Sequence, residues 1–422
     1  MYKKIKNLLK SLGPGFITGA SDDDPSGIAT YSQTGAQFGY TQLWTSLFSF
    51  PFMAIIQEMC GRIGLVTGRG IAVIAREHYA KSILYIAVFL LLVANTINIG
   101  ADLGAMASAT GLLIGLPFVV ILIFFTVLTL LLEVLVPYPA YSKILKYLTV
   151  SLFAYVFTAI IIKQDWRSIT LATLIPTISF KEDYIFNIVA ILGTTISPYL
   201  FFWQADEEVE EEIEDGKLNY MGHGTPQITK RDIKKMRADT LVGMFFSNIV
   251  MFFIIVVAAS TLHLHDITTI QTADQAASAL KPFAGEFAFL LFALGIIGTG
   301  LLAVPVLAGS AAYAIAETFR WKAGLGLKFR RAHGFYGVIT IATIVGLLVN
   351  FTPVKPFQML YYAAILNGVV APPLIVLLLF IANNKKIMGD HTNSLLSNVF
   401  GIAIALIMGI ASVLLFANLI KL

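Results

Sequence analysis

The chain has 422 residues, of which 57% are hydrophobic and only 13% are charged, whereas soluble domains carry about 25% charged residues. This composition excludes an ordinary soluble protein and indicates an integral membrane protein. The formal net charge of +4 is small, so it gives no reason to expect nucleic acid as a partner. A single cysteine, Cys60, leaves no disulfide framework and no cysteine-based metal site.

Apolar runs separated by short polar links follow one another along the chain, and a run of about 20 residues can cross the bilayer core. The pattern predicts an all-α protein with eleven membrane-spanning helices, in one transmembrane domain covering residues 1–422. The predicted limits are 13–38, 41–66, 82–113, 117–137, 141–163, 185–205, 237–261, 284–316, 334–351, 356–382 and 397–420.

The basic residues predict the orientation of these helices. Of the 29 Lys and Arg residues, 23 fall on the side of the N-terminus and the other 6 fall on the opposite side. Because basic links stay in the cytoplasm, we expect a cytoplasmic N-terminus and an external C-terminus in a cell membrane. No signal-peptide cleavage site follows the basic residues 1–10. The short termini favour a bacterial inner membrane, and we expect a monomer.

Two of the predicted spans are interrupted near their middle. The first contains "GASDDDPSGIA" (19–29), in which three aspartates precede Pro25, and the sixth contains "GTTISPY" (193–199), in which Pro198 breaks the helix. Interrupted spans in corresponding positions are typical of transporters built from inverted repeats. The sequence thus predicts repeat one over about 13–163, repeat two over about 185–382 and an extra helix over about 397–420.

The aspartates Asp22, Asp23 and Asp24 need a counter-charge, because each unpaired charge at mid-membrane costs roughly 2.5–3.5 kcal/mol. No Lys, Arg or His lies in the middle of any predicted span, so the natural partner is a mobile cation. Carboxylates and unwound carbonyl groups make an oxygen-rich site suited to Mg²⁺, Mn²⁺ or Ca²⁺. The alternative is that one or two of the aspartates cap the half-helix that begins at Ser26.

The stretch "GPGFITGASDDDPSGIAT" resembles the start of the Nramp divalent-metal transporters, whose pattern is G-P-G-F followed by D-P-G-N. "GRIGLVTGRGIAVIAREHY" resembles the link after their second helix, and "LGTTISPYLFFWQ" resembles their sixth helix around M-P-H. The resemblance implies a LeuT-type fold of five plus five helices, with helices 1 and 6 broken and the metal bound between the breaks.

Departures from the family pattern suggest which ion is carried. Gly27 replaces an Asn ligand, Ser197 stands where the family has its metal-binding Met, and Tyr199 stands where it has His. A thioether favours soft transition metals, and Mg²⁺ tends to keep several waters while touching one or two carboxylates. The pattern is similar to the Nramp-related magnesium transporters, so the sequence favours import of Mg²⁺ as a partly hydrated ion, with Mn²⁺ as a second substrate.

The resemblance also implies site residues. Asp24 would be the main carboxylate, the carbonyl groups of Ser21 and Thr194 would be ligands, and Gly27 and Ser197 would shape the cavity and hold water. Asp22, Asp23 and Tyr199 are further candidates for attracting the ion or binding its water shell, and Asp22 or Asp23 could instead cap the helix. No resident cofactor and no catalytic residue is expected.

Proton-coupled members of the family are thought to use acids on helix 3, the helix 6 His and arginines on helix 9. Asp102 matches the first acid, but Ala105 replaces the second, and span 334–351 lacks arginine. The sequence therefore predicts uncoupled transport, with proton-coupled transport of Mn²⁺ or another transition metal as the alternative. Asp102 could equally be a satisfied polar residue between helices. Asn367 and Gln204 are candidates for lining the pathway, with an interhelical hydrogen bond as the other interpretation of Asn367.

Other functional classes fit less well. A cation channel usually builds its carboxylate ring from several subunits, three aspartates would repel an amino-acid substrate, and no enzyme motif is present. The acidic run 206–215 is either a solvated helix extension, whose acids pair with bases across the link, or a cytoplasmic cation sensor. Glu58 and Arg62 are predicted to form an i,i+4 pair, and Glu133 is expected at the membrane interface.

Overall fold

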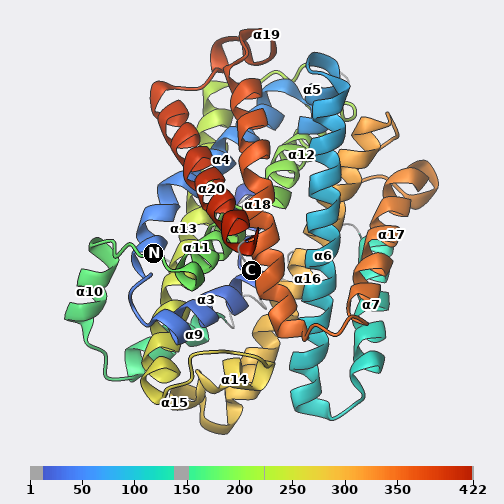
Figure 1. Ribbon diagram of the computed structural model, residues 1–422. Coiled ribbons are helices and arrows are strands. Elements are labelled where there is room, and N and C mark those ends of the chain that lie inside the picture. Colours follow the sequence, from blue (N-terminus) through green and yellow to red (C-terminus); the bar gives the residue numbers. More distant parts are fainter. Residues whose placement is uncertain (1–12, 137–151, 223, 421–422) are drawn as a thin grey trace, which may run out of the picture.

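The computed structural model describes residues 13–136, 152–222 and 224–420 (Figure 1). The described residues fold into a bundle of helices in which most of the predicted spans are recovered with nearly the predicted limits. Part of the fifth span, residues 141–151, and the basic residues 1–10 lie outside the described residues.

The helices of the first half begin with α2 (Pro14–Asp22), α3 (Pro25–Phe38), α4 (Trp44–Thr67) and the short α5 (Ile71–His78). They continue with α6 (Lys81–Ile114), α7 (Phe118–Leu135), α9 (Phe153–Ile161) and α10 (Trp166–Leu174).

The helices of the second half are α11 (Glu182–Thr195), α12 (Pro198–Glu214), α13 (Lys230–Thr261), α14 (Ala273–Ser278), α15 (Lys281–Ala284) and α16 (Ala288–Thr318). They are followed by α17 (His333–Val349), α18 (Pro356–Asn383), α19 (Lys385–Met388) and α20 (Leu395–Ile420). Single 3-10 turns lie at His263–His265, Gly285–Phe287, Phe329–Arg331 and Gly389–His391.

Both predicted breaks are present. Span one is divided into α2 and α3, and span six into α11 and α12, and each second half begins with a proline. Proline suits the first helical position because its missing N–H would have no intrahelical partner there. By contrast, Pro51, Pro305 and the pair Pro372-Pro373 lie inside continuous helices.

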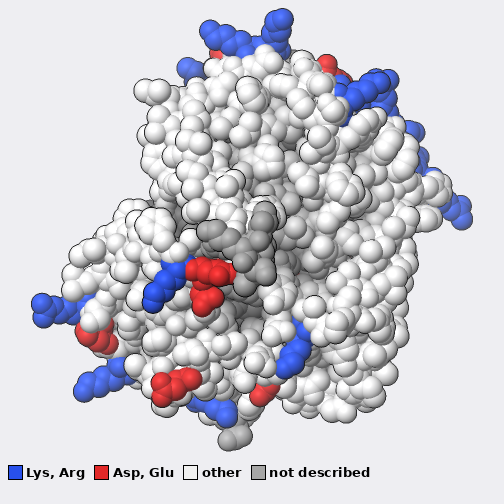
Figure 2. Space-filling view, viewed as in Figure 1, with Lys and Arg blue, Asp and Glu red and all other residues white. Residues whose placement is uncertain are grey.

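Within the described residues, seven helices are long and apolar enough to span a membrane. They include the joined halves over Glu182–Glu214, while the shorter His333–Val349 is apolar over 17 residues. The protein is therefore a multi-pass membrane protein, and the count of eleven spans stays a prediction. Figure 2 shows Lys and Arg gathered at the end of the bundle formed by α5 and α19, and the neighbouring surface of α18 and α20 carries no charged residue. This end is called the α5–α19 end below.

The two broken helices occupy the centre of the bundle. α3 contacts α13, α18, α11 and α6, whereas α12 lies between α4 and α16 and also contacts α2. α2 packs closely on α13, because a Cβ atom at Gly19 would collide with the Gly243 carbonyl group. Small residues allow this approach of two backbones inside a membrane, so the glycine fixes the position of α2.

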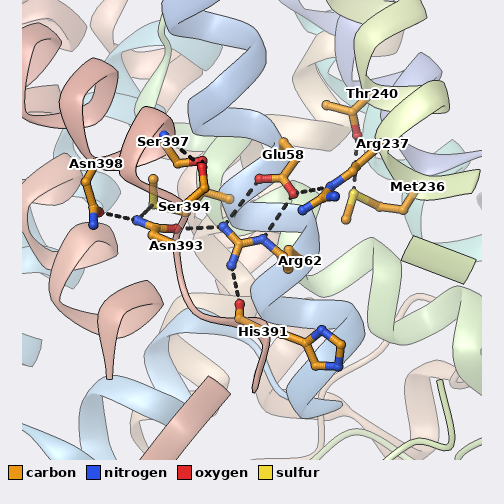
Figure 3. A network of polar contacts seen from close by, with 11 residues as sticks. Glu58, Arg62, Met236, Arg237, Thr240, His391, Asn393, Ser394, Ser397 and Asn398 are labelled. Carbon is orange, nitrogen blue, oxygen red and sulfur yellow. Dashed lines mark hydrogen bonds and ion pairs between the residues drawn. The ribbon is translucent and has the colours of Figure 1, made fainter. Parts of the chain in front are cut away.

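A polar network joins helices at the α5–α19 end (Figure 3). The predicted Glu58–Arg62 pair is confirmed, with Arg62 Nε 3.0 Å from Glu58 Oε1. Arg237 Nε of α13 lies 2.7 Å from the same oxygen, and Arg62 also donates to Asn393 Oδ1 at 2.6 Å and to the His391 carbonyl group. The pair therefore ties α4 to α13 and to the segment before α20, which sequence spacing alone does not reveal.

Candidate functional site

The first break is closed by the side chain of Asp24. Its backbone is extended, with φ −67° and ψ 172°, and its Oδ1 accepts hydrogen bonds from Gly27 N and Ser26 Oγ, both at 2.7 Å. Asp24 is thus the N-cap of α3, and its carboxylate also lies at the positive end of the α3 dipole. The capping role suggested by the sequence is confirmed for this one of the three aspartates.

The second oxygen of Asp24 faces α6. Asn98 Nδ2 donates to Asp24 Oδ2 at 2.8 Å. Among the described residues, the Asn98 Oδ1 atom and both carboxylate oxygens of Asp102, four residues further along α6, have no hydrogen-bond partner although they are buried. The interpretation of Asp102 as a satisfied polar residue is therefore wrong, because none of these residues donates to it.

Asp22 and Asp23 share one donor on α13. Ser247 Oγ lies 2.8 Å from Asp22 Oδ2 and 3.2 Å from Asp23 Oδ1, while the other oxygen of each carboxylate has no partner among the described residues. The three aspartates of the break have at most 1% of their surface exposed. In the part of the chain that the structure describes, no Lys or Arg forms an ion pair with them. The break therefore concentrates buried carboxylates without a fixed counter-charge.

The second break offers hydroxyl and carbonyl oxygens in place of carboxylates. α11 ends at Thr195 and α12 starts at Pro198. Ser197 Oγ donates to the Thr194 carbonyl oxygen at 2.7 Å and lies 3.0 Å from that of Gly193. Each carbonyl oxygen has two lone pairs, so Thr194 can still accept a second partner.

The two breaks lie against each other. Tyr199 of α12 donates its hydroxyl to the Ser21 carbonyl group at 2.9 Å. A Cβ atom at Gly27 would stand 3.2 Å from Thr194 Oγ1 and 3.3 Å from the Asp22 carbonyl oxygen, and Thr194 Oγ1 has no partner among the described residues. The glycine therefore lets the two breaks approach, with oxygen atoms of both breaks beside it.

These oxygens suit a hard cation that keeps some of its water. Among the described residues, no cluster of three or more His, Cys, Asp or Glu side chains is placed to hold a metal ion. The donor set would accordingly be one or two carboxylates, carbonyl groups, hydroxyl groups and water, which is the kind of coordination that Mg²⁺ and related ions accept.

Of the remaining predicted residues, Asn367 of α18 is buried, and neither its Nδ2 nor its Oδ1 atom has a hydrogen-bond partner among the described residues. The interhelical bond, one of the two interpretations of Asn367, is therefore not found there. Gln204 does not join the breaks. It lies further along α12 and donates to Glu208 Oε1 at 2.8 Å. Glu133 lies in the last turn of α7 and is 4% exposed, and neither of its carboxylate oxygens has a hydrogen-bond partner among the described residues. Its expected position at the membrane interface stays a prediction.

The acidic run on α12 also differs from expectation. Lys235 pairs with Glu211 at 2.7 Å, which confirms pairing across the link. However, Asp206, Glu208 and Glu212 are at most 2% exposed, so the run is not a solvated extension. α12 packs against α4, α16 and α5, and the local sequence gives no sign of this packing.

Two residues that contact the break were missed. Asn98 could have been noticed because a second amide, Asn95, precedes it by three residues in an apolar span. Ser247 gives no comparable signal, since isolated serines are common in membrane helices.

The fold and the paired breaks define a class of membrane transporter. The structure is similar to the Eremococcus coleocola manganese transporter in complex with an aromatic bis-isothiourea compound, with a TM-score of 0.74 and 17% identity over 98% of this chain and 87% of that chain. It is also similar to Mhp1, a nucleobase-cation-symport-1 family transporter, with a TM-score of 0.58 and 13% identity over 97% and 93% of the two chains. The protein therefore has the LeuT-type transporter fold.

The sequence comparisons then identify the family. The profile of the Nramp family, described as "Natural resistance-associated macrophage protein-like", matches residues 15–418, and the chain belongs to this family. It is 26% identical to the "Divalent metal cation transporter MntH" of Klebsiella pneumoniae subsp. pneumoniae over 93% of this chain and 89% of the relative. It is 25% identical to the protein of the same name from Caldanaerobacter subterraneus subsp. tengcongensis, over 95% and 91%.

Proposed function

We propose that the protein is a divalent metal cation transporter that works by alternating access, with the ion held between the breaks of α2/α3 and α11/α12. The observation that carries the proposal is the group of three buried aspartates at the first break, which contacts the second break through Tyr199 and has no fixed counter-charge among the described residues. A carboxylate in this environment needs a cation or a proton, and a transported ion supplies the cation.

Mn²⁺ is the proposed cargo, since the relatives named above are described as divalent metal cation and manganese transporters. The sequence favours Mg²⁺, but the comparisons lend that preference no support. Mg²⁺ remains the second candidate because of one specific feature. Ser197 stands in the second break, so no thioether from that position selects against hard ions.

In this proposal Asp24 supplies the main carboxylate while it caps α3. The carbonyl groups of Ser21 and Thr194 are further ligands, each with one lone pair left by its hydroxyl donor. Gly27 and Ser197 leave room for water, and Tyr199 sets the distance between the breaks.

Proton co-transport belongs to the proposal, in place of the uncoupled mechanism expected from the sequence. Within the described ranges, Asp22 and Asp23 each have one carboxylate oxygen without a hydrogen-bond partner, and Asp102 has two. These carboxylates can take up a proton when the cation leaves, and a relay of buried acids is the usual device for moving protons through a membrane protein.

We further propose that the protein lies in a bacterial inner membrane as a monomer, with its N-terminus and the α5–α19 end in the cytoplasm and its C-terminus outside. The distribution of basic residues supports this orientation.

The decisive experiment compares Asp24→Asn with Asp24→Ala in proteoliposomes that contain dyes for Mn²⁺, Mg²⁺ and pH. Asparagine caps a helix about as well as aspartate, so Asp24→Asn should keep the thermal stability of the protein while it abolishes saturable Mn²⁺ uptake and the accompanying acidification. Asp24→Ala should lose uptake and also roughly 1–3 kcal/mol of stability, because Asn98 and Gly27 lose their acceptor.

Asp390→Ala is the matched control, because this aspartate is exposed on the short segment after α19. It should transport like the wild-type protein. Undiminished Mn²⁺ uptake by Asp24→Asn would refute the proposed site. Saturable Mg²⁺ uptake with no Mn²⁺ signal and no acidification would replace the proposal by the magnesium mechanism.

A further inference from the structure

The α5–α19 end contains a small cavity that the transport site does not use. It measures about 20 Å³ and lies between α12, α13 and the last turn of α4, where Leu65 closes it. A volume of this size holds about one water molecule or one ion. Its lining includes two lysines and six carboxylates, namely Glu208, Glu211, Glu212, Asp215, Asp232 and Asp239.

The two lysines neutralise only part of this charge. Lys217 lies 3.2 Å from Asp232 and 3.5 Å from Asp215, and Lys235 lies 2.7 Å from Glu211. Glu208, Glu212 and Asp239, which line the same cavity, form no ion pair in the described part of the chain. Three of the six carboxyl groups that line the cavity therefore have no basic partner among the described residues.

Glu212 is the carboxylate of this cavity for which neither a counter-charge nor a donor is found among the described residues. It is 1% exposed, and in the part of the chain that the structure describes neither of its carboxylate oxygens has a hydrogen-bond partner. Two neighbouring carboxylates do have hydrogen-bond donors. Glu208 accepts from Gln204 at 2.8 Å, and Asp239 accepts from Gly13 N and Gly15 N at 3.0 and 2.8 Å. An unpaired buried carboxylate is costly unless a cation or a proton joins it.

We propose that this cavity is a second divalent cation site, distinct from the site between the breaks, with Glu212 and Glu208 as its carboxylate ligands. The two residues are four positions apart on α12 and so lie on one helix face. Two carboxylates and several waters are the coordination that Mg²⁺ and Mn²⁺ accept without a full protein cage. The water can enter where the exposed Asp215 opens the cavity to the surface.

The site is placed to sense ions at the inner half of the first broken helix. Asp239 holds the first turn of α2 through Gly13 and Gly15. A bound cation would reduce the repulsion between Asp239 and the glutamates of α12, so it would stabilise α2 in the position seen here. We therefore expect occupancy of the site by internal ion to slow transport.

Equilibrium binding of Mn²⁺ alone to the purified full-length protein, followed by its paramagnetic signal, tests this site. The wild-type protein should bind two ions and Asp24→Asn should bind one. Glu212→Gln should weaken the remaining site in the Asp24→Asn protein by roughly tenfold or more, as changes around a metal site commonly do. Glu214→Gln, an exposed acid on the same helix, is the matched control and should change nothing.

A second measurement tests the site without any substitution at the cavity, so misfolding of a cavity variant cannot affect its result. In the Asp24→Asn protein, Mn²⁺ should still raise the unfolding temperature, because a ligand that binds only the folded state stabilises it. No rise, or equal affinity in Glu212→Gln and Glu214→Gln, would overturn the second site and leave the transport proposal intact. Loss of uptake in Asp24→Asn with both ions still bound would overturn the transport proposal instead.

Discussion

Two groups of buried carboxylates can be compared, the break group (Asp22, Asp23 and Asp24) and the α12 group (Asp206, Glu208 and Glu212). Both groups are at most 2% exposed. The break group interrupts an apolar run, so its burial is visible in the sequence. The α12 group lies in a strongly polar run, and it is buried only because other helices cover it. Local hydropathy thus reveals a buried charge only where the neighbouring residues are apolar.

The groups also differ in their partners. Asp24 has donors from Gly27, Ser26 and Asn98. Neither oxygen of Asp206 has a donor among the described residues. Its carboxyl group instead faces that of Glu317 closely enough for the two to share a proton, and a Cβ atom at Gly70 would touch both. A carboxylate that accepts hydrogen bonds on both oxygens is held in place. Two carboxyl groups that face each other favour binding of a proton or a cation between them.

The largest effect should come from a substitution in the close contact between α2 and α13, next to the break group. Gly19→Val places a side chain against the backbone of Gly243, which cannot move without shifting α13. We expect roughly 3 kcal/mol or more of destabilisation, measured as thermal unfolding in detergent together with loss of Mn²⁺ uptake. Gly409→Val on α20, where no atom lies within 4 Å, is the control. Equal effects of the two substitutions would show that the close packing of α2 does not position the break.

A smaller effect should follow from adding a soft ligand to the second break. Ser197→Met should favour Mn²⁺ over Mg²⁺ by about tenfold, or 1.4 kcal/mol, because a thioether disfavours hard ions. The ratio of initial uptake rates measures this change. Ser197→Ala removes the hydroxyl without adding sulfur and should leave the ratio nearly unchanged. A Met variant that behaves like the Ala variant would place Ser197 outside the ion's reach.

A stabilising effect of about 1 kcal/mol is expected from Asp206→Asn. The amide can donate to Glu317, whose Oε2 already accepts from Val73 N at 3.2 Å, and the facing negative charges are removed. Thermal unfolding of Asp206→Asn beside the exposed-acid control Glu214→Gln measures the difference. Destabilisation would mean that the native pair is held by a partner that asparagine cannot replace.

The smallest effect is expected at an exposed acid, whose accessibility to solvent contrasts with the burial of both groups. Hydrogen bonds from the hydroxyl and the backbone N–H of Ser168 lower the pKa of Asp165, the N-cap of α10. Because the pKa is lower in the folded state, ionised Asp165 stabilises the protein at pH values above its unfolded pKa of about 3.9. This stabilisation is lost as the pH falls through the folded-state pKa. Unfolding temperatures across this acid range should therefore fall slightly more for the wild-type protein than for Asp165→Asn. Parallel curves would contradict the assignment.

Much of the architecture was predictable from hydropathy and prolines. Both breaks fall where Pro25 and Pro198 predict them, and the Glu58–Arg62 pair follows from i,i+4 spacing. The additional bonds of Arg62 to the segment before α20 were not predictable, since their partners lie more than 300 residues away. Asp102 and Asn367 could be identified as polar residues in apolar spans, but not as residues without a partner, because that depends on every side chain packed around them.

The sequence by itself determined the apolar runs, the positions of the two helix breaks and the presence of three carboxylates in the first of them, since these depend on residues adjacent in the chain. Only the tertiary structure decided that Asn98 and Ser247 reach those carboxylates and that Tyr199 binds the Ser21 carbonyl group. It also decided that the acids of α12 are buried. These contacts join residues from 74 to 225 positions apart, and such contacts follow from how helices pack rather than from any local pattern.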